Sequence, residues 1–272
     1  MPEGPEIRRA ALTLHRALSG HRLRHAYSSV GALQEGVAAL IGQRVEAVCS
    51  RGKAMLTHFG NGQTLYSHNQ LYGRWELLEE GDYPQTNRSL RLALHAGGRM
   101  ALLYSASDIA LLDAQGLEAH PYLRRLGPEL LDERVDEARI RARFEAPRFQ
   151  RRALFGLLQD QGFVSGMGNY LACEVLHRAA VHPQRRLADL SPEQRRALAD
   201  ASLRLTRQSL HTGGITNDPQ RAERLQRQGA DFESCRFLVY RREGLPCYRC
   251  GAPIEKGRYG GRMGYCCPAC QR

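Results

Sequence analysis

The first six residues, Met-Pro-Glu-Gly-Pro-Glu, combine a potential amine nucleophile with carboxylates. Pro2 is small, so we expect an aminopeptidase to remove Met1 and leave a secondary amine at the terminus. An α-amino group has a reference pKa of about 7.7–8.0 and a lysine side chain about 10.4. Near pH 7.5, a larger fraction of the terminal amine than of a lysine is therefore neutral and able to attack a carbon. The iminium that it forms has no N–H proton to lose and stays charged. We therefore predict covalent catalysis by the Pro2 amine, with Glu3 beside it and Glu6 one helical turn further on. The alternative is that Pro5 and the acids only cap a helix.

The basic side chains single out Lys53. Of 39 lysines and arginines, only Lys53 and Lys256 are lysines. Arginine is the better phosphate ligand, because its planar guanidinium donates to two oxygens and stays charged. Lysine can share a proton where arginine cannot, and the preceding Gly52 lets the backbone approach a ligand. We expect a catalytic Lys53, although a lysine left among the arginines by chance is the alternative.

Four cysteines near the end of the chain have the spacing of a zinc site. Two residues separate Cys247 from Cys250, sixteen follow, and two separate Cys267 from Cys270. This spacing predicts one structural Zn²⁺ held by four thiolates on a β-hairpin, and we expect no organic cofactor. The alternative, two disulfides, requires an oxidising compartment that nothing in the sequence suggests. The remaining cysteines are predicted to be a bystander (Cys266) or buried or free (Cys49, Cys173 and Cys235).

Three further segments could contact nucleic acid. Gln70–Tyr72 lies in a break between strand-like runs and could wedge into a base stack, or it could be a turn buried under a neighbouring loop. Asn169 begins a helix after a glycine-rich turn, and exposed amides at a helix N-terminus bind phosphate; the alternative is a plain helix–turn–helix packing unit. Arg262, between the cysteine pairs, could enter a minor groove or contact a phosphate.

The composition agrees with an anionic partner. The net charge is +11 and the isoelectric point is about 9.6, which favours nucleic acid over membrane, with an inert basic surface as the alternative. No run of about 18 apolar residues is present, so we expect no membrane span. The polar N-terminus does not resemble a signal peptide. These features predict a cytoplasmic, nucleoid-associated bacterial protein, or a nuclear one in another cell.

The elements that must position these residues change in character along the chain. Residues 5–20 read as an amphipathic helix, and alternating apolar runs between residues 45 and 104 predict antiparallel strands in a sandwich or barrel-like sheet. The composition shifts near residues 124–136, after which the pattern is helical. One helix should run from Asn169 through Glu174. Residues 211–232, polar and glycine-rich, are predicted to form a mobile loop.

Together, the motifs resemble the formamidopyrimidine-DNA glycosylase/endonuclease VIII family. The terminal hexapeptide, Arg-Gly-Lys at 51–53, Gly-Met-Gly-Asn-Tyr at 166–170 and the four-cysteine finger occur in family order, and the resemblance covers essentially the whole chain. Gly4 and Tyr-Ser-His-Asn-Gln-Leu-Tyr-Gly at 66–73 favour the bacterial endonuclease VIII branch. One departure is Cys266, where an aromatic residue often precedes the third zinc ligand.

The resemblance implies an α+β fold of two domains. It implies an N-terminal antiparallel β-sandwich with flanking helices at residues 1–126 and an interdomain hinge at 127–136. A helical helix–two-turn–helix domain would follow at 137–232 and a β-hairpin zinc finger at 233–272. DNA would bind in the cleft between the domains of a monomer.

The resemblance also implies a base-excision-repair DNA glycosylase with AP lyase activity that removes oxidised bases, chiefly pyrimidines, from double-stranded DNA. Pro2 would attack the sugar C1′ of a flipped nucleotide, Glu3 would act as the acid, and Lys53 would hold the 5′ phosphate or the sugar and assist protonation. Glu6 and Glu174 would have supporting roles.

The remaining site residues would contact DNA. Gln70, Leu71 and Tyr72 would fill the hole left by the flipped nucleotide, and Asn169 and Arg262 would clamp the phosphates around it. Two alternatives stay open: the same chemistry on oxidised purines, and a non-catalytic protein that binds damaged DNA.

Overall fold

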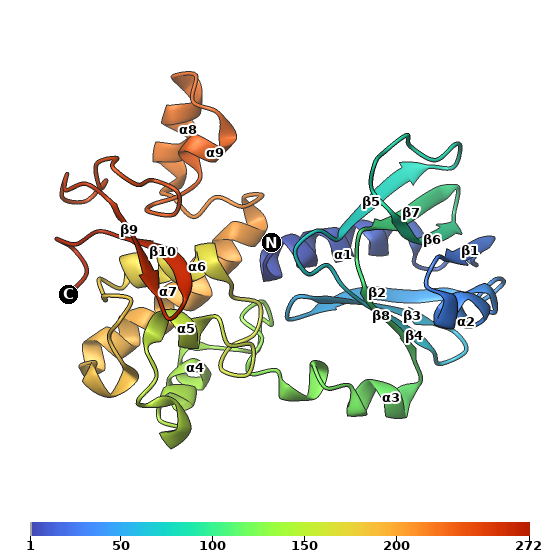
Figure 1. Ribbon diagram of the computed structural model, residues 1–272, viewed down its shortest axis with the longest axis horizontal. Coiled ribbons are helices and arrows are strands. Elements are labelled where there is room, and N and C mark those ends of the chain that lie inside the picture. Colours follow the sequence, from blue (N-terminus) through green and yellow to red (C-terminus); the bar gives the residue numbers. More distant parts are fainter. Residues whose placement is uncertain (1) are drawn as a thin grey trace. The chain divides into compact units, whose positions relative to one another are not determined.

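The computed structural model describes residues 2–272, and the chain divides into two compact units, one ending at Arg125 and one beginning at Leu126 (Figure 1). The expected removal of Met1 lies outside the described residues. No helix within residues 2–272 is both long enough and apolar enough to cross a membrane.

The first unit contains two antiparallel sheets of four strands each. One has the order β1-β6-β7-β5 and the other β2-β3-β4-β8. The first sheet comprises β1 (His25–Ser28), β6 (Leu90–Ala96), β7 (Arg99–Tyr104) and β5 (Arg74–Glu79). The second comprises β2 (Val45–Arg51), β3 (Ala54–Phe59), β4 (Thr64–His68) and β8 (Asp108–Leu112).

Helix α1 (Gly4–Leu18) joins the two sheets in one apolar core. Its residues at helical spacing, Ile7, Ala11, Leu14 and Leu18, are buried, and the same cluster includes Val45 and Phe59 of one sheet and Leu92 and Leu103 of the other. Within residues 2–272, no strand of one sheet pairs with a strand of the other, so this unit has two sheets rather than a closed barrel. The predicted antiparallel arrangement is confirmed.

Short helices complete this unit: η1 (Gly31–Leu33), α2 (Gln34–Ala38), α3 (Ala114–Ala119) and η2 (Leu123–Arg125). On the second sheet, Ala54, Leu56 and Tyr66 form a separate buried cluster, which Leu117 of α3 and Leu123 of η2 partly cover. These last elements therefore anchor the end of the first unit to its sheet.

The second unit is helical and ends in a hairpin, as predicted. Its elements are α4 (Glu137–Phe144), η3 (Pro147–Phe149), α5 (Leu154–Leu158), α6 (Asn169–Arg178), η4 (Leu187–Asp189), α7 (Pro192–His211), α8 (Pro219–Arg227), α9 (Phe232–Cys235), β9 (Glu255–Tyr259) and β10 (Arg262–Cys266). Ser191 and Gln194 form the expected capping box of α7. A single apolar core runs from α4 to the cysteine finger.

The predicted loop at 211–232 is wrong, because this segment contains α8 and the start of α9. Asp218 caps α8 by accepting a hydrogen bond from Arg221 N at 2.9 Å, and Pro219 occupies the first turn. Most of α8 is polar, so its composition resembles that of a loop. Its start signal, Asp-Pro, was nevertheless present in the sequence.

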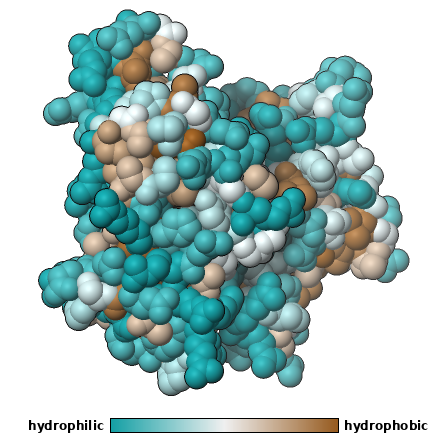
Figure 2. All heavy atoms as spheres, turned by 60° about the vertical axis from the view of Figure 1, so that its left-hand side comes forward, coloured by the Kyte–Doolittle hydropathy of each residue, from teal (hydrophilic) through white to brown (hydrophobic). Residues whose placement is uncertain are grey.

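The face of the molecule in Figure 2 agrees with the polar composition. Hydrophilic residues cover most of the face in Figure 2, and its apolar patches are small and separate.

Candidate functional site

The first described residues start α1. Glu3 has an extended backbone and precedes the first helical residue, and it forms a capping box with Glu6. Glu3 N donates to Glu6 Oε2 at 3.0 Å, and Glu6 Oε1 accepts from Arg9 Nη2 at 3.2 Å. The capping that was the alternative to catalysis is therefore present. Glu3 is also 3% exposed, so its carboxyl group is shielded from bulk water.

Lys53 lies in the two-residue turn between β2 and β3. Gly52 has a φ of 60°, in the left-handed region that favours glycine. Lys53 is only 9% exposed, and its backbone N–H donates to Tyr122 Oη at 2.8 Å. The turn thus holds a lysine in a buried position.

The turn between β4 and β5 presents two large apolar side chains. Leu71 and Tyr72 are 59% and 73% exposed. The alternative of a hydrophobic turn buried under a neighbouring loop is therefore wrong for these residues. Exposed side chains of this size lose the stabilisation of burial, and they are available to a partner.

The backbone of this turn is tightly constrained. Gly73 N donates to Asn69 O at 2.7 Å, and a Cβ at Gly73 would lie 2.5 Å from the same oxygen. Gln70 has a φ of 51°, which is uncommon for a residue with a side chain, and its Oε1 accepts from Ser107 Oγ at 2.8 Å. The exposed side chains therefore project from an ordered loop.

A pocket of about 340 Å³ brings the terminus and this loop together. Pro2 and Glu6 line it with Leu71 and Tyr72, although these pairs lie far apart in the sequence, and Arg88 adds a positive charge. Glu3 and Lys53 are buried and are not among the lining residues. Of the three predicted catalytic residues, Pro2 is the one that faces this pocket.

In the second unit, Asn169 is the first residue of α6. The turn before it is closed by Gln161, whose Oε1 accepts from Gly166 N at 3.0 Å and whose Nε2 donates to Met167 O at 2.8 Å. Asn169 is half-buried, and its Oδ1 has no hydrogen-bond partner within residues 2–272. A polar side chain that is not fully satisfied, beside the N–H groups of a helix start, is suited to contact a ligand.

Arg262 begins β10, directly after two glycines of positive φ. Its Nη1 donates to Gln159 Oε1 at 3.2 Å, and Gln159 O accepts from Gln161 Nε2 at 3.0 Å. Two glutamines thus connect the finger tip to the turn before α6. Hydrogen bonds thus link Arg262 to the turn that directly precedes Asn169, the other predicted phosphate ligand of this unit.

Glu174 is fully buried in the middle of α6. Its Oε1 accepts from Val239 N at 2.8 Å and Tyr240 N at 2.9 Å, and its Oε2 contacts Leu238 N at 2.7 Å and Thr216 Oγ1 at 2.6 Å. Burial raises the pKa of Glu174, and these hydrogen bonds oppose the rise. The geometry shows that this carboxyl group ties α6 to the segment that leads into the finger.

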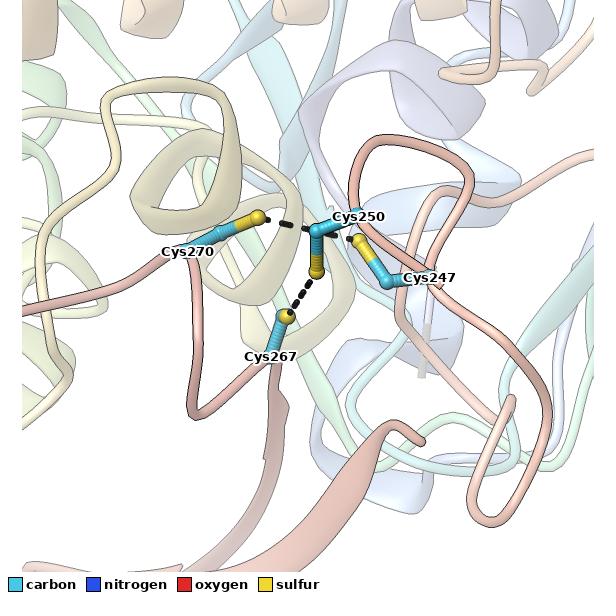
Figure 3. A group of neighbouring side chains, drawn as sticks. All are labelled: Cys247, Cys250, Cys267 and Cys270. Carbon is cyan, nitrogen blue, oxygen red and sulfur yellow. Dashed lines mark hydrogen bonds between the residues drawn. The ribbon is translucent and has the colours of Figure 1, made fainter. Parts of the chain in front are cut away.

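The four finger cysteines, Cys247, Cys250, Cys267 and Cys270, converge on one point (Figure 3). All their Sγ atoms lie within 4.8 Å of one another, with Cys247–Cys270 at 3.9 Å and Cys250–Cys267 at 3.4 Å. Thiolates around a tetrahedral zinc, with Zn–S of about 2.3 Å, lie about 3.8 Å apart, whereas disulfide sulfurs lie about 2.05 Å apart. The cysteines are free in the structure, so the donor set fits a metal ion and not two disulfides.

The surroundings of this cluster also fit thiolate ligands. His177 Nε2 lies 3.4 Å from Cys247 Sγ, and Arg249 N donates to the same sulfur at 3.4 Å. Burial lowers the pKa of His177 to about 4, so its imidazole is neutral near pH 7 and can donate one N–H. Cys266 is buried and contacts Tyr259 Oη at 3.1 Å, outside the cluster, as expected for a bystander.

Tyr122, Gln159 and His177 contact predicted site residues and were not themselves predicted. Each acts through a tertiary contact with a residue distant in sequence. Tyr122 and Gln159 carry no motif that would have drawn attention to them. His177 lies one helical turn after Glu174, in a helix that the sequence did predict.

Comparison with known proteins places these features in one family. The model of the formamidopyrimidine-DNA glycosylase N-terminal domain matches residues 1–107, and that of the formamidopyrimidine-DNA glycosylase H2TH domain matches residues 126–220. Endonuclease 8 of Enterobacter sp. (strain 638) is 45% identical over 272 residues, with all of both chains covered.

Solved structures give the same fold. Lactococcus lactis Fpg (MutM) in complex with DNA containing an oxidised pyrimidine aligns over 100% of both chains with a TM-score of 0.82 and 23% identity. Lactococcus lactis Fpg in complex with DNA containing an abasic site aligns over 99% of both chains with a TM-score of 0.81 and 23% identity. With its matching domains, its full-length similarity to endonuclease 8 and its four-cysteine finger, the chain belongs to the formamidopyrimidine-DNA glycosylase/endonuclease VIII family.

Proposed function

We propose that this base-excision DNA glycosylase removes oxidised pyrimidines from duplex DNA and then cleaves the abasic site, with the Pro2 amine as nucleophile. The damaged base leaves the stack, and the Pro2 nitrogen attacks the sugar C1′ as the base departs with the electron pair of the glycosidic bond. The sugar ring then opens by cleavage of the C1′–O4′ bond, which converts the adduct to an iminium. This iminium acidifies the neighbouring C–H, which permits β- and then δ-elimination. This chemistry requires the removal of Met1, so that Pro2 carries the free amine.

The observation that carries this proposal is the shared pocket of Pro2, Leu71 and Tyr72. A flipped nucleotide leaves a gap in the base stack, and apolar wedges inserted at base steps stabilise distorted DNA. Leu71 and Tyr72 are large, exposed and held on a constrained turn. In the proposal, they fill the gap with Gln70 while the nucleotide meets Pro2.

Glu3 and Lys53 complete the proposed chemistry. Glu3 donates a proton to the sugar ring oxygen so that the ring opens, and its position directly after Pro2, with a carboxyl group shielded from bulk water, supports this role. Lys53 holds the 5′ phosphate or the sugar and assists protonation. Glu6 supports Glu3, through the capping box that orders the start of α1.

The second unit supplies further DNA contacts in this proposal. Asn169 at the start of α6 and Arg262 at the finger tip bind backbone phosphates, which fix the register of the DNA without reading its sequence. Gln159 and Gln161 link Arg262 to the turn that precedes Asn169. Glu174 supports this network from within α6.

We further propose that Zn²⁺ binds Cys247, Cys250, Cys267 and Cys270. A tetrahedral four-thiolate zinc cross-links its ligands and stabilises the fold around it. Here it would hold the hairpin that carries Arg262. No reaction step involves this ion.

Functionally, the proposal assigns residues 1–126 to catalysis, 127–136 to an interdomain hinge, 137–232 to the helical DNA-binding domain and 233–272 to the zinc finger of a monomer. Damaged duplex DNA is the proposed partner, in line with the Lactococcus lactis Fpg complexes, whose DNA contains an oxidised pyrimidine or an abasic site.

Excision from matched duplexes tests the proposal. One duplex would carry thymine glycol, a second 8-oxoguanine and a third no lesion. We expect faster excision of thymine glycol than of 8-oxoguanine, strand cleavage with the products of δ-elimination, and loss of both in Pro2→Gly. Faster excision of the purine would overturn the lesion class. Tight binding without excision in wild-type protein would favour a non-catalytic damage-binding protein.

A further inference from the structure

Tyr122 makes an unexpected contact with the turn that carries Lys53. Its hydroxyl oxygen lies 2.8 Å from Lys53 N and accepts that N–H. Gly52 and Lys53 are the two residues between β2 and β3, and Gly52 has the positive φ found at the first position of a type II′ turn. The N–H of the second turn residue lies outside the strand ladder, and Tyr122 Oη is its acceptor.

The ring of Tyr122 is itself held by its neighbours. It lies edge-on to His68 at 5.2 Å and tilted to Tyr66 at 6.3 Å between ring centroids, and the Arg125 guanidinium lies 5.5 Å from its centroid. Tyr122 also packs on the buried cluster that contains Ala54, the residue after Lys53. The hydroxyl is therefore fixed in position by packing, and it is not a mobile surface group.

Tyr122 belongs to the last segment of the first unit. It directly precedes η2, and the chain enters the second unit at Leu126. Arg124 N donates to His120 O at 3.1 Å, so this segment is ordered around Tyr122. The backbone of Lys53 is thus tied to the chain that connects the two units.

We infer that Tyr122 is a positioning residue for Lys53: its hydroxyl holds the Lys53 backbone, and through it the lysine amine, in the geometry needed for base removal. This inference rests on the catalytic role proposed for Lys53. Replacing Tyr122 by phenylalanine keeps the ring and its packing but removes the acceptor, and the Lys53 N–H must then find another partner or shift. Small displacements of a catalytic group reduce rates strongly.

The scarcity of lysine makes the contact directly measurable. Only Lys53 and Lys256 occur in the chain, so ¹⁵N-lysine labelling gives two amide signals, and Lys53→Arg assigns them. Lys256 in β9 is an internal reference. We expect the Lys53 amide to be protected from exchange in wild-type protein and to exchange at least about tenfold faster in Tyr122→Phe, as for loss of a buried hydrogen bond, with Lys256 unchanged.

A matched variant controls for the loss of a phenol. Tyr83 Oη forms a 3.0 Å hydrogen bond with His95 Nε2 in the same unit. Tyr83→Phe removes the same chemical group elsewhere and should leave both lysine amides unchanged. Unprotected exchange of Lys53 in wild-type protein, or unaltered exchange in Tyr122→Phe, would overturn the inference without any activity assay.

Activity separates positioning from general stability. In single-turnover reactions, Tyr122→Phe should excise thymine glycol about tenfold more slowly, while its affinity for the same duplex stays within about twofold of wild type. Tyr83→Phe should match wild type in both. A faster Lys53 exchange with an unchanged excision rate would refute the positioning role. If wild-type protein excises no lesion, the proposed function fails, and the amide exchange still decides whether Tyr122 holds Lys53.

Discussion

Replacing Glu174 with glutamine should destabilise the second unit by a definable amount. In the best orientation, the amide oxygen keeps the hydrogen bonds from Val239 N and Tyr240 N, and the amide NH₂ takes the place of Oε2. Thr216 can accept from this group, but Leu238 N–H then faces a second donor. One unpaired buried donor costs about 1–3 kcal/mol, which is the expected loss in the free energy of unfolding.

A graded series sharpens this prediction. Glu174→Ala leaves three backbone N–H groups without their acceptor, so the same rule gives a loss of about 3–9 kcal/mol, comparable to a typical total stability of about 5–15 kcal/mol. Glu133→Gln makes the same chemical change at an exposed position of this unit and should be neutral.

Urea and thermal unfolding followed by circular dichroism measure these losses. At about 2–4 °C per kcal/mol, Glu174→Gln should lower Tm by about 2–12 °C. Amide exchange at residues 238–240 should accelerate in the same variant, because these N–H groups contact the carboxyl group. A Glu174→Gln protein as stable as Glu133→Gln, with unchanged exchange at 238–240, would refute this account of Glu174.

Other predictions concern DNA binding, chemistry and metal. Arg262→Ala should weaken binding to lesion DNA and reduce, by about one unit, the slope of log affinity against log salt concentration. Arg262→Lys should recover part of the affinity. An unchanged slope in a binding titration argues against a phosphate contact. Lys53→Arg should bind lesion DNA with an affinity within about tenfold of wild type but lose excision of a damaged base, with a smaller effect on cleavage at a preformed abasic site. If Lys53→Arg excises the base at the wild-type rate, Lys53 is only a phosphate ligand. Elemental analysis should find one zinc per chain. Cys267→Ser should lose both the zinc and DNA binding, whereas Cys266→Ser should keep both. Active protein that contains no zinc would contradict the assignment.

Local patterns predicted much of the fold. The apolar spacing of Ile7, Leu14 and Leu18 predicts the buried stripe of α1, and the Ser191–Gln194 capping box marks the start of α7. Spacing alone also identified the four-cysteine cluster, because two short pairs on a hairpin bring four sulfurs together. Such features depend on neighbours in sequence, so the sequence displays them directly.

Tertiary relations were harder to predict. The exposure of Leu71 and Tyr72 depends on how the loop packs, and the sequence left a buried turn equally open. Glu174 was expected to support the site, but its contacts with the backbone at 238–240 depend on how a distant segment folds over α6. The contact of Tyr122 with Lys53 likewise joins residues far apart in the chain.

The most direct test of the central claim is covalent trapping at Pro2. Wild-type protein would react with a thymine-glycol duplex in the presence of borohydride, which reduces an iminium to a stable amine. Mass mapping of the digested adduct should place the sugar on the Pro2 nitrogen of a chain without Met1, and Pro2→Gly should trap far less. An adduct on Lys53, or no adduct from protein that cleaves the duplex, would contradict the proposed mechanism.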